Sequence, residues 1–191
     1  MMEYENRYNG IRKVFWGYFF LYFNINIESV SILPSFVGYL LFLSAIGCLE
    51  EEERELSLLR PLGGILAVWH GVNWLASWGG VTLDGMFPVV DILVGLINLY
   101  FHFQLLTNMA SIARKHQPED YSLDAELLRY RTVQTVILTA MILLGYVSER
   151  FENFGVVAAL GMAIVYLIAG IGLMKTLHEL KGCLPEEETV K

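Results

Sequence analysis

Six long apolar segments, separated by short polar or charged stretches, follow one another along the whole chain. A helix needs roughly 20 apolar residues to cross the hydrocarbon core of a bilayer. The pattern therefore predicts six transmembrane helices. They cover about residues 14–27, 32–49, 62–78, 87–108, 133–147 and 154–174. The first and fifth are short, so we expect them to extend through Ile11 and Arg131 into the headgroup region. The predicted fold is all-α, a single six-helix membrane domain covering residues 1–191.

Basic residues lie almost entirely in one set of the predicted loops. Lys and Arg near the ends of transmembrane helices stay in the cytoplasm, so their distribution sets the orientation. Only Arg150 of the 13 lies on the opposite side. The others are Arg7, Arg12, Lys13, Arg54, Arg60, Arg114, Lys115, Arg129, Arg131, Lys175, Lys181 and Lys191. Removing one span would invert every later loop and destroy this asymmetry. The sequence therefore predicts an inner-membrane protein with both termini in the cytoplasm.

Composition agrees with a membrane protein and excludes several partners. Hydrophobic residues make up 55% of the chain and charged residues 17%, against about 25% charged in soluble domains. The net charge of −7 comes largely from glutamates at the predicted cytoplasmic ends, which argues against a nucleic-acid partner. Cys48 and Cys183 both lie near the cytoplasmic face and form no C-x-x-C pair, so neither a disulfide nor a zinc site is expected.

The first apolar segment is predicted to be a retained helix and not a cleaved signal peptide. Residues 15–23 are almost entirely aromatic, and no small-x-small cleavage site follows them. We expect Trp16 and Tyr18 to lie near the cytoplasmic headgroups.

After this segment, Asn24, Asn26 and Glu28 alternate with two isoleucines. The alternation is typical of an extended or re-entrant strand lining an external mouth; a solvated helix end is the alternative.

Polar residues inside the third and fourth spans are the main functional candidates, because polar groups in hydrocarbon are costly unless paired or wet. The third span carries His70 and Asn73 one turn apart, and the fourth carries Asp91, Asn98 and His102. At about 100° per residue the latter three fall within roughly 40° of arc. The two spans are joined by a short loop, so we expect the two polar stripes to face each other.

Three interpretations of these stripes remain open. In the first, the groups hydrogen-bond one another and only hold the helices in register. In the second, they line a pathway or pocket for a small solute, an ion or a proton, because histidine titrates near neutral pH. In the third, His70 and His102 ligate a b-type haem, or bind a metal together with Asp91. Their expected depths differ by about 7 Å at 1.5 Å per residue, which is awkward for one iron.

Small residues repeat along the sixth span at Gly155, Ala159 and Ala163. Such a stripe allows close helix approach in lipid. It indicates packing within the bundle or, alternatively, a docking face for a second copy of the chain or a transporter partner subunit.

The loop before the fifth span holds a candidate helix start at Ser122 and Asp124. Leu123, Leu127 and Leu128 would then lie along the membrane surface.

Two resemblances to known families can be drawn. The segment Ile32–Tyr39, Ile-Leu-Pro-Ser-Phe-Val-Gly-Tyr, resembles a signature of uncharacterised small multi-pass proteins of Gram-positive bacteria, which implies a bacterial plasma membrane and no particular activity. The size and six-span topology are similar to those of the substrate-binding subunits of energy-coupling-factor vitamin transporters. That resemblance implies a small-ligand site and a coupling subunit docked on a small-residue stripe.

Catalytic motifs are not evident: the sequence holds no H-E-x-x-H and no nucleophile with a histidine at helical spacing. The identity of any cofactor stays open, with haem or metal binding as a minor alternative. The sequence therefore favours a solute- or ion-handling transport component over an enzyme. The alternative is a structural or regulatory membrane subunit whose polar residues only pack helices.

Overall fold

The computed structural model describes residues 2–23, 26–27, 30–31, 34–81, 83, 85–147 and 152–184. Within them the fold is helical, as predicted, apart from two short strands. The helices are α1 (Met2–Tyr22), α2 (Ser35–Leu49), α3 (Leu59–Trp78), α4 (Pro88–His116), α5 (Leu123–Val147) and α6 (Glu152–Cys183). A short 3-10 helix, η1 (Arg54–Leu58), links α2 to α3. Strands β1 (Asn26–Ile27) and β2 (Val30–Ser31) pair antiparallel between α1 and α2.

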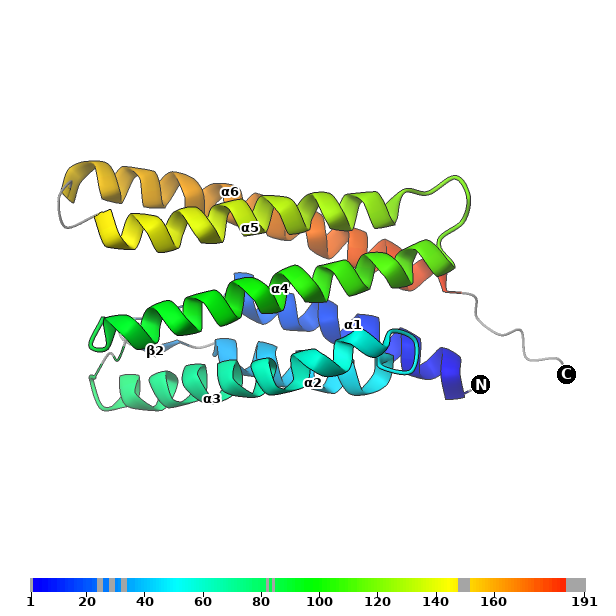
Figure 1. Ribbon diagram of the computed structural model, residues 1–191, viewed down its shortest axis with the longest axis horizontal. Helices are drawn as coiled ribbons and strands as arrows, with labels where there is room; N and C mark the ends of the chain where they lie inside the picture. The colour runs from blue at the N-terminus through cyan, green and yellow to red at the C-terminus, as the bar shows by residue number, and fades with distance from the viewer. Residues whose placement is uncertain are drawn as a thin grey trace, which may run out of the picture.

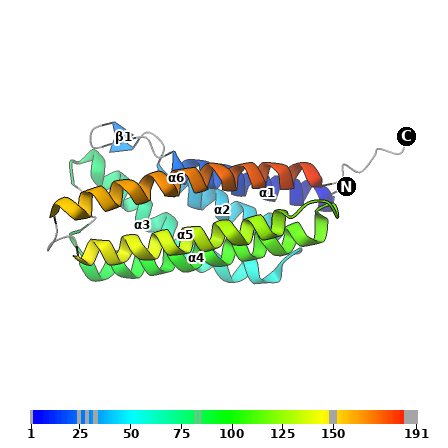
Figure 2. The same cartoon turned by 90° about the horizontal axis from the view of Figure 1, so that it is seen from above.

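The six helices run along the long axis of the molecule and alternate in direction (Figure 1). Each helix packs against the next one in the sequence, and α6 returns to pack against α1. Figure 2 shows α6 alongside α1 from above. The bundle is therefore a closed ring whose interior is filled by side chains. We call the end where α1 begins and α6 ends the terminal end, and the opposite end, with the α3–α4 turn, the hairpin end.

Three helices are long and apolar enough to cross a membrane: α4, residues Leu123–Leu144 of α5, and residues Leu160–Cys183 of α6. Helix α2 is equally apolar but has 15 residues. Helix α1 carries charged residues through its first half, and the polar His70 and Asn73 lower the mean hydropathy of α3. The composition of three helices thus indicates a membrane protein.

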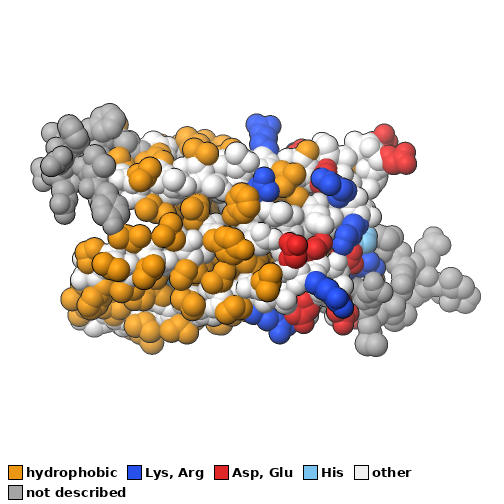
Figure 3. Space-filling view, viewed as in Figure 1, with side chains coloured by type: hydrophobic (Ala, Val, Ile, Leu, Met, Phe, Trp, Pro, Cys, Tyr) orange, Lys and Arg blue, Asp and Glu red, His pale blue; other side chains and the backbone are white. Residues whose placement is uncertain are grey.

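On the face shown in Figure 3, the surface is apolar over the half nearer the hairpin end, whereas charged side chains gather toward the terminal end. Contact of such a large apolar surface with water is unfavourable, whereas contact with lipid chains carries no such cost. The large side chains that are at least 60% exposed are Leu58, Val68, Leu75, Trp78, Val89, Val136, Leu143, Val157, Leu160 and Ile168.

The helices differ from the apolar segments that predicted them mainly at the terminal end. Helix α1 begins at Met2, and α6 continues to Cys183. The expected surface helix before the fifth span is wrong, because α5 is one continuous helix from Leu123. Leu123 and Leu127 are buried in the core, where they are held by neighbouring helices and not by lipid. Tyr18 is fully buried among other helices, whereas Trp16 is 45% exposed; their depth relative to the headgroups stays a prediction.

Glycines allow α1 and α2 to cross closely. A Cβ atom added at Gly38 would lie 2.8 Å from the backbone oxygen of Gly17, which cannot move without shifting α1. Small residues at such crossings are the usual solution in lipid. The close contacts of α6 lie at Gly170 and Gly172, which face Tyr22 and Tyr130.

The small-residue stripe predicted on the sixth span is only partly described. Ala163 is exposed on the surface of α6. The burial of Gly155 and Ala159 lies outside what the structure describes. A docking role for this stripe stays a prediction.

Candidate functional site

Tyr39 of α2 is the centre of a group of polar and aromatic side chains in the interior of the bundle. Its side chain is buried, and its hydroxyl donates a hydrogen bond of 2.8 Å to Oδ1 of Asn98 on α4. Its ring stacks on the imidazole of His70 from α3, with centroids 5.0 Å apart and planes at 10°. The same ring lies 6.2 Å from the imidazole of His102 on α4. One tyrosine therefore contacts both histidines of the predicted polar stripes.

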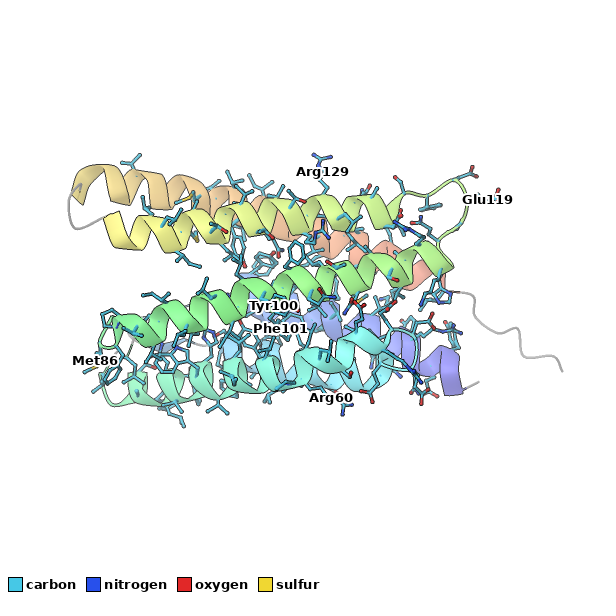
Figure 4. The ribbon with its side chains drawn as sticks, viewed as in Figure 1. Arg60, Met86, Tyr100, Phe101, Glu119 and Arg129 are labelled. Carbon is cyan, nitrogen blue, oxygen red and sulfur yellow. The ribbon has the colours of Figure 1, made fainter. Side chains whose placement is uncertain are left out.

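His102 is the most enclosed polar candidate, with 3% of its surface exposed. Its Nδ1 lies 3.2 Å from the hydroxyl of Tyr18 on α1. The rings of Phe42 and Phe101 stand edge-on to it, at 5.9 and 5.5 Å between centroids. Figure 4 labels Phe101 beside the exposed Tyr100 on α4. The imidazole thus has one hydroxyl partner in otherwise aromatic surroundings.

His70 lies closer to the hairpin end and is half-buried. Its Nδ1 lies 3.4 Å from Oγ of Ser35, at the first residue of α2. Ser35 follows Pro34, whose fixed φ suits the position before a helix. The polar groups therefore extend from the start of α2 inward to His102. We call Tyr18, Ser35, Tyr39, His70, Asn98 and His102 the Tyr39 cluster.

Two of the five candidate residues lie apart from this cluster. Oδ1 of Asn73 accepts a hydrogen bond of 3.2 Å from the backbone N–H of Leu83, and Oδ2 of Asp91 accepts one of 3.0 Å from the backbone N–H of Gly85. Gly85 has a positive φ of 84°, which glycine adopts without strain. Asn73 and Asp91 therefore hold the turn between α3 and α4.

The polar residues of α3 and α4 were expected to contact each other directly. Instead, His70, Asn98 and His102 all contact Tyr39 of α2, which lies outside the predicted stripes. His102 also contacts Tyr18 of α1. Tyr18 was also missed. The signal in the sequence is a tyrosine within an apolar segment, because its hydroxyl needs a partner when buried.

Of the three residues predicted to line an external mouth, the structure describes Asn26. Asn26 lies in β1 and pairs with Ser31 of β2, so its backbone is extended, as one of the two alternatives predicted. Asn24 and Glu28 lie outside the described residues.

A second buried polar set joins α1 to α5 and α6. Nε2 of Gln134 donates a hydrogen bond to the Tyr22 hydroxyl, and the rings of Tyr22 and Tyr166 are 4.8 Å apart. The hydroxyl of Thr176 donates to Glu126 at 2.7 Å. Polar contacts therefore join α5 and α6 to the bundle, as the Tyr39 cluster joins α1 to α4.

Apolar side chains close the Tyr39 cluster toward the terminal end. Phe42, Leu66 and Leu105 are fully buried there. A layer of buried apolar side chains therefore lies between His102 and the charged end of the bundle.

Beyond this layer, an ionic group joins α1, the α2–η1 link and the end of α4. Glu52 lies 3.3 Å from Arg7, 3.1 Å from His116 and 3.7 Å from Lys115. Burial alone would raise the pKa of the Glu52 carboxyl, but His116, Lys115 and Arg7 outweigh it and hold that pKa below its ordinary value. Glu53 adds an ion pair with Lys115 at 3.3 Å. We call Arg7, Glu52, Glu53, Lys115 and His116 the Glu52 cluster.

The haem and metal interpretations do not fit this arrangement. Side chains from α1, α2 and α4 pack directly around the imidazole of His102 and fill the space that a porphyrin would occupy. Asp91, the proposed third ligand, is bound to the α3–α4 turn. Within the described part of the chain, no three His, Cys, Asp or Glu side chains are grouped to hold a metal ion.

Comparisons of the chain with protein-family models, with curated proteins and with solved structures found no significant match.

Proposed function

We propose that this chain is a proton-handling transport component of a bacterial plasma membrane, with the Tyr39 cluster as its site. In this proposal it crosses the membrane six times, and both termini are cytoplasmic. Protons, or protons coupled to a small polar solute, enter the cluster from the hairpin end. A second copy of the chain or a transporter subunit could pack on its exposed apolar faces.

The topology proposal is supported by the distribution of charge along the bundle. The six helices are antiparallel neighbours, so an even number of crossings would bring both ends of the chain to one side. Among the described residues, the Lys and Arg side chains gather toward the terminal end (Figure 3). Cytoplasmic loops carry this excess in bacterial membrane proteins.

The observation that carries the proposal is the contact of both His70 and His102 with Tyr39. An ionisable side chain within a membrane bundle is costly and marks a functional site by default. Histidine is also the side chain that changes charge near neutral pH. If the cluster only packed helices, asparagine, serine and tyrosine could supply the same hydrogen bonds without a side chain whose charge depends on pH.

Protonation of either imidazole would alter the contacts that hold four helices together. A cationic His102 would have the Tyr18 hydroxyl and the rings of Tyr18, Tyr39, Phe42 and Phe101 around it, with no carboxylate among the contacts described. Titratable groups that contact the two histidines include Tyr18 from α1 and Tyr39 from α2. A proton taken up by the cluster would therefore favour separation of α1, α2 and α4. Movement of Phe42 would then open the apolar layer.

A structural or regulatory subunit is the second candidate, and a specific observation favours it. Asn73, Asp91, Asn98 and His102 all have hydrogen-bond partners in the closed bundle. Such satisfied groups also hold helices in register.

Proton uptake into sealed vesicles separates the two candidates. The protein is reconstituted in liposomes that contain a pH-sensitive dye, and an imposed membrane potential drives protons inward. We expect uptake above that of empty vesicles, and we expect His70→Gln and His102→Gln to reduce it at least about tenfold, the size of a lost proton-transfer group.

The matched control is His116→Gln, which removes an imidazole from the Glu52 cluster and leaves the Tyr39 cluster intact. Each variant is first shown to be folded by circular dichroism and by gel filtration in detergent. Uptake that equals the empty-vesicle rate in the wild type, or that persists in both core variants, would favour the structural candidate.

A further inference from the structure

A groove of about 440 Å³ lies between α1 and α6, on the outer side of the ring. Phe15 and Phe23 of the α1 segment and Ile171 and Met174 of α6 form its apolar part. The volume falls in the range of small-molecule sites, about 300–1,000 Å³. Because the groove is open along the face that a bilayer would cover, its occupant in a membrane is a lipid chain.

Charged and polar side chains lie at one end of this groove. Lys175, His178 and Glu179, all on α6, line the part nearer the terminal end. The Lys175 ammonium is 3.4 Å from the Glu179 carboxylate, and 78% of the Lys175 side chain is exposed. The imidazole of His178 lies 6.3 Å from the ring of Phe15, at the boundary between the polar and apolar parts.

The polar end of the groove begins where the apolar segment of α6 ends. Lys175 directly follows the apolar stretch of about residues 154–174, so in a membrane its side chain would lie where the hydrocarbon core meets the headgroups. Lysine side chains extend several ångströms further toward the headgroups while their methylene groups stay in apolar surroundings.

We propose that this groove binds a phospholipid whose headgroup carries both a phosphate and a primary ammonium, as in phosphatidylethanolamine. One acyl chain lies against Phe15, Phe23, Ile171 and Met174. The phosphate is bound by Lys175 and His178, and the ammonium donates hydrogen bonds to Glu179. The proposal needs only the membrane location of the chain and is independent of proton handling.

The choice of headgroup follows from the pairing of opposite charges at the groove. A zwitterion replaces one Lys175–Glu179 ion pair by two charge-assisted contacts and leaves no charge unpaired. A purely anionic headgroup would place its phosphate next to the Glu179 carboxylate. Phosphatidylcholine has a quaternary ammonium with no N–H, so it cannot donate to Glu179.

Native mass spectrometry of the full chain in a mild detergent tests the proposal. Phosphatidylethanolamine, phosphatidylcholine and phosphatidylglycerol with identical acyl chains are added separately. We expect one phosphatidylethanolamine to stay bound, about two- to fivefold more than the other two lipids, as an exposed ion pair would give. Lys175→Gln should lower the retention of all three lipids, and Glu179→Gln should remove the preference for phosphatidylethanolamine.

Arg129→Gln and Glu119→Gln are the matched controls. Both residues are exposed, lie outside the groove and are labelled in Figure 4, so neither change should alter lipid retention. Equal retention of the three lipids would mean surrounding bilayer lipid only and would overturn the proposal. Preference for phosphatidylglycerol would overturn it too, in favour of an anionic-lipid site, and retention of none would show that the groove is not a lipid site.

Discussion

The Tyr39 cluster and the Glu52 cluster join nearly the same helices by different chemistry. Around Tyr39, neutral side chains from α1 to α4 share two short hydrogen bonds and a stack of rings. Around Glu52, charged side chains from α1, the α2–η1 link and α4 form ion pairs at 3.1–3.7 Å. Buried apolar side chains separate the two regions.

The difference shows where this bundle tolerates charge. A formal charge in a low-dielectric interior costs several kcal/mol unless it is paired, whereas the end of a bundle is reached by water. The interior accordingly uses hydroxyls, an amide and imidazoles, and the carboxylates and guanidinium lie at the end. Histidine is the one side-chain type in the Tyr39 cluster whose ordinary pKa lies near neutral pH, and His70 is the less enclosed of the two histidines.

The largest expected effect comes from removing the ring that joins the first region. Tyr39→Ala would leave a cavity against two histidines, Phe42 and Phe101. Losing a buried aromatic side chain costs about 3–5 kcal/mol of unfolding free energy. Thermal unfolding in detergent, followed by circular dichroism, measures it. A change in stability below that of Glu52→Ala would reverse the ranking of the two regions.

A smaller loss is expected at the helix crossing beside Tyr39. Gly38→Ala places a methyl group 2.8 Å from the Gly17 carbonyl oxygen and must push α1 and α2 apart. Overpacking of this kind costs about 1–3 kcal/mol. Gly64→Ala on α3 is the control, because an added Cβ meets no atom within 4 Å there. Equal unfolding temperatures for the two variants would show that the crossing is looser than described.

At the terminal end, Glu52→Gln should reduce stability by about 1–2 kcal/mol at neutral pH, as expected for a lost charged hydrogen bond. The pKa of this carboxyl is lower in the fold than its ordinary value, because His116, Lys115 and Arg7 outweigh the effect of burial. Its contribution is therefore complete above the unfolded pKa, about 4.3, and is lost as pH falls through the lower folded value.

The pH dependence of unfolding in the wild type and in Glu52→Gln checks this sign. The stability difference between them should shrink on acidification below about pH 4.3. The exposed Glu51→Gln serves as the control. A difference that grows as the pH falls would contradict the assigned direction.

The smallest effect on stability is expected at Asp91, one of the polar residues that the sequence placed in the candidate site. Asp91→Asn keeps an oxygen that accepts the hydrogen bond from the Gly85 N–H. We expect stability to change by less than about 0.5 kcal/mol, with no change in proton uptake. A large loss of uptake in this variant would return Asp91 to the functional site.

The apolar segments predicted the number of helices and their order along the chain. Each helix packs against the next one in the sequence, so the chain order also gives most neighbours. The partners of the polar residues were not predictable from two adjacent spans. Spacing along α4 placed Asn98 and His102 on one face, but it holds no information on which helix covers that face. Tyr18 and Tyr39 occupy that position, and aromatic residues in an apolar segment are equally typical of a lipid-facing or headgroup position.

The helix ends were mispredicted for a related reason. We expected each helix to end where charged residues begin. Helix α4 instead continues to His116, which pairs with Glu52. Arg114 near the end of α4 pairs with Asp124 near the start of α5, so only a short loop separates the two helices. The segment that resembles a family signature proved structurally informative: Ser35, Gly38 and Tyr39 all make contacts that hold the site.

The most direct test of proton handling is the charge displaced by a pH step on a solid-supported membrane that contains the protein. We predict that a step from about pH 8 to about pH 6, around the ordinary pKa of histidine, gives a transient current in the wild type that begins at His70, the less enclosed of the two imidazoles. A folded protein with both His70→Gln and His102→Gln should lose that current. Identical traces from the wild type, the double variant and empty membranes would contradict the account, because the two imidazoles at Tyr39 would then take up no protons.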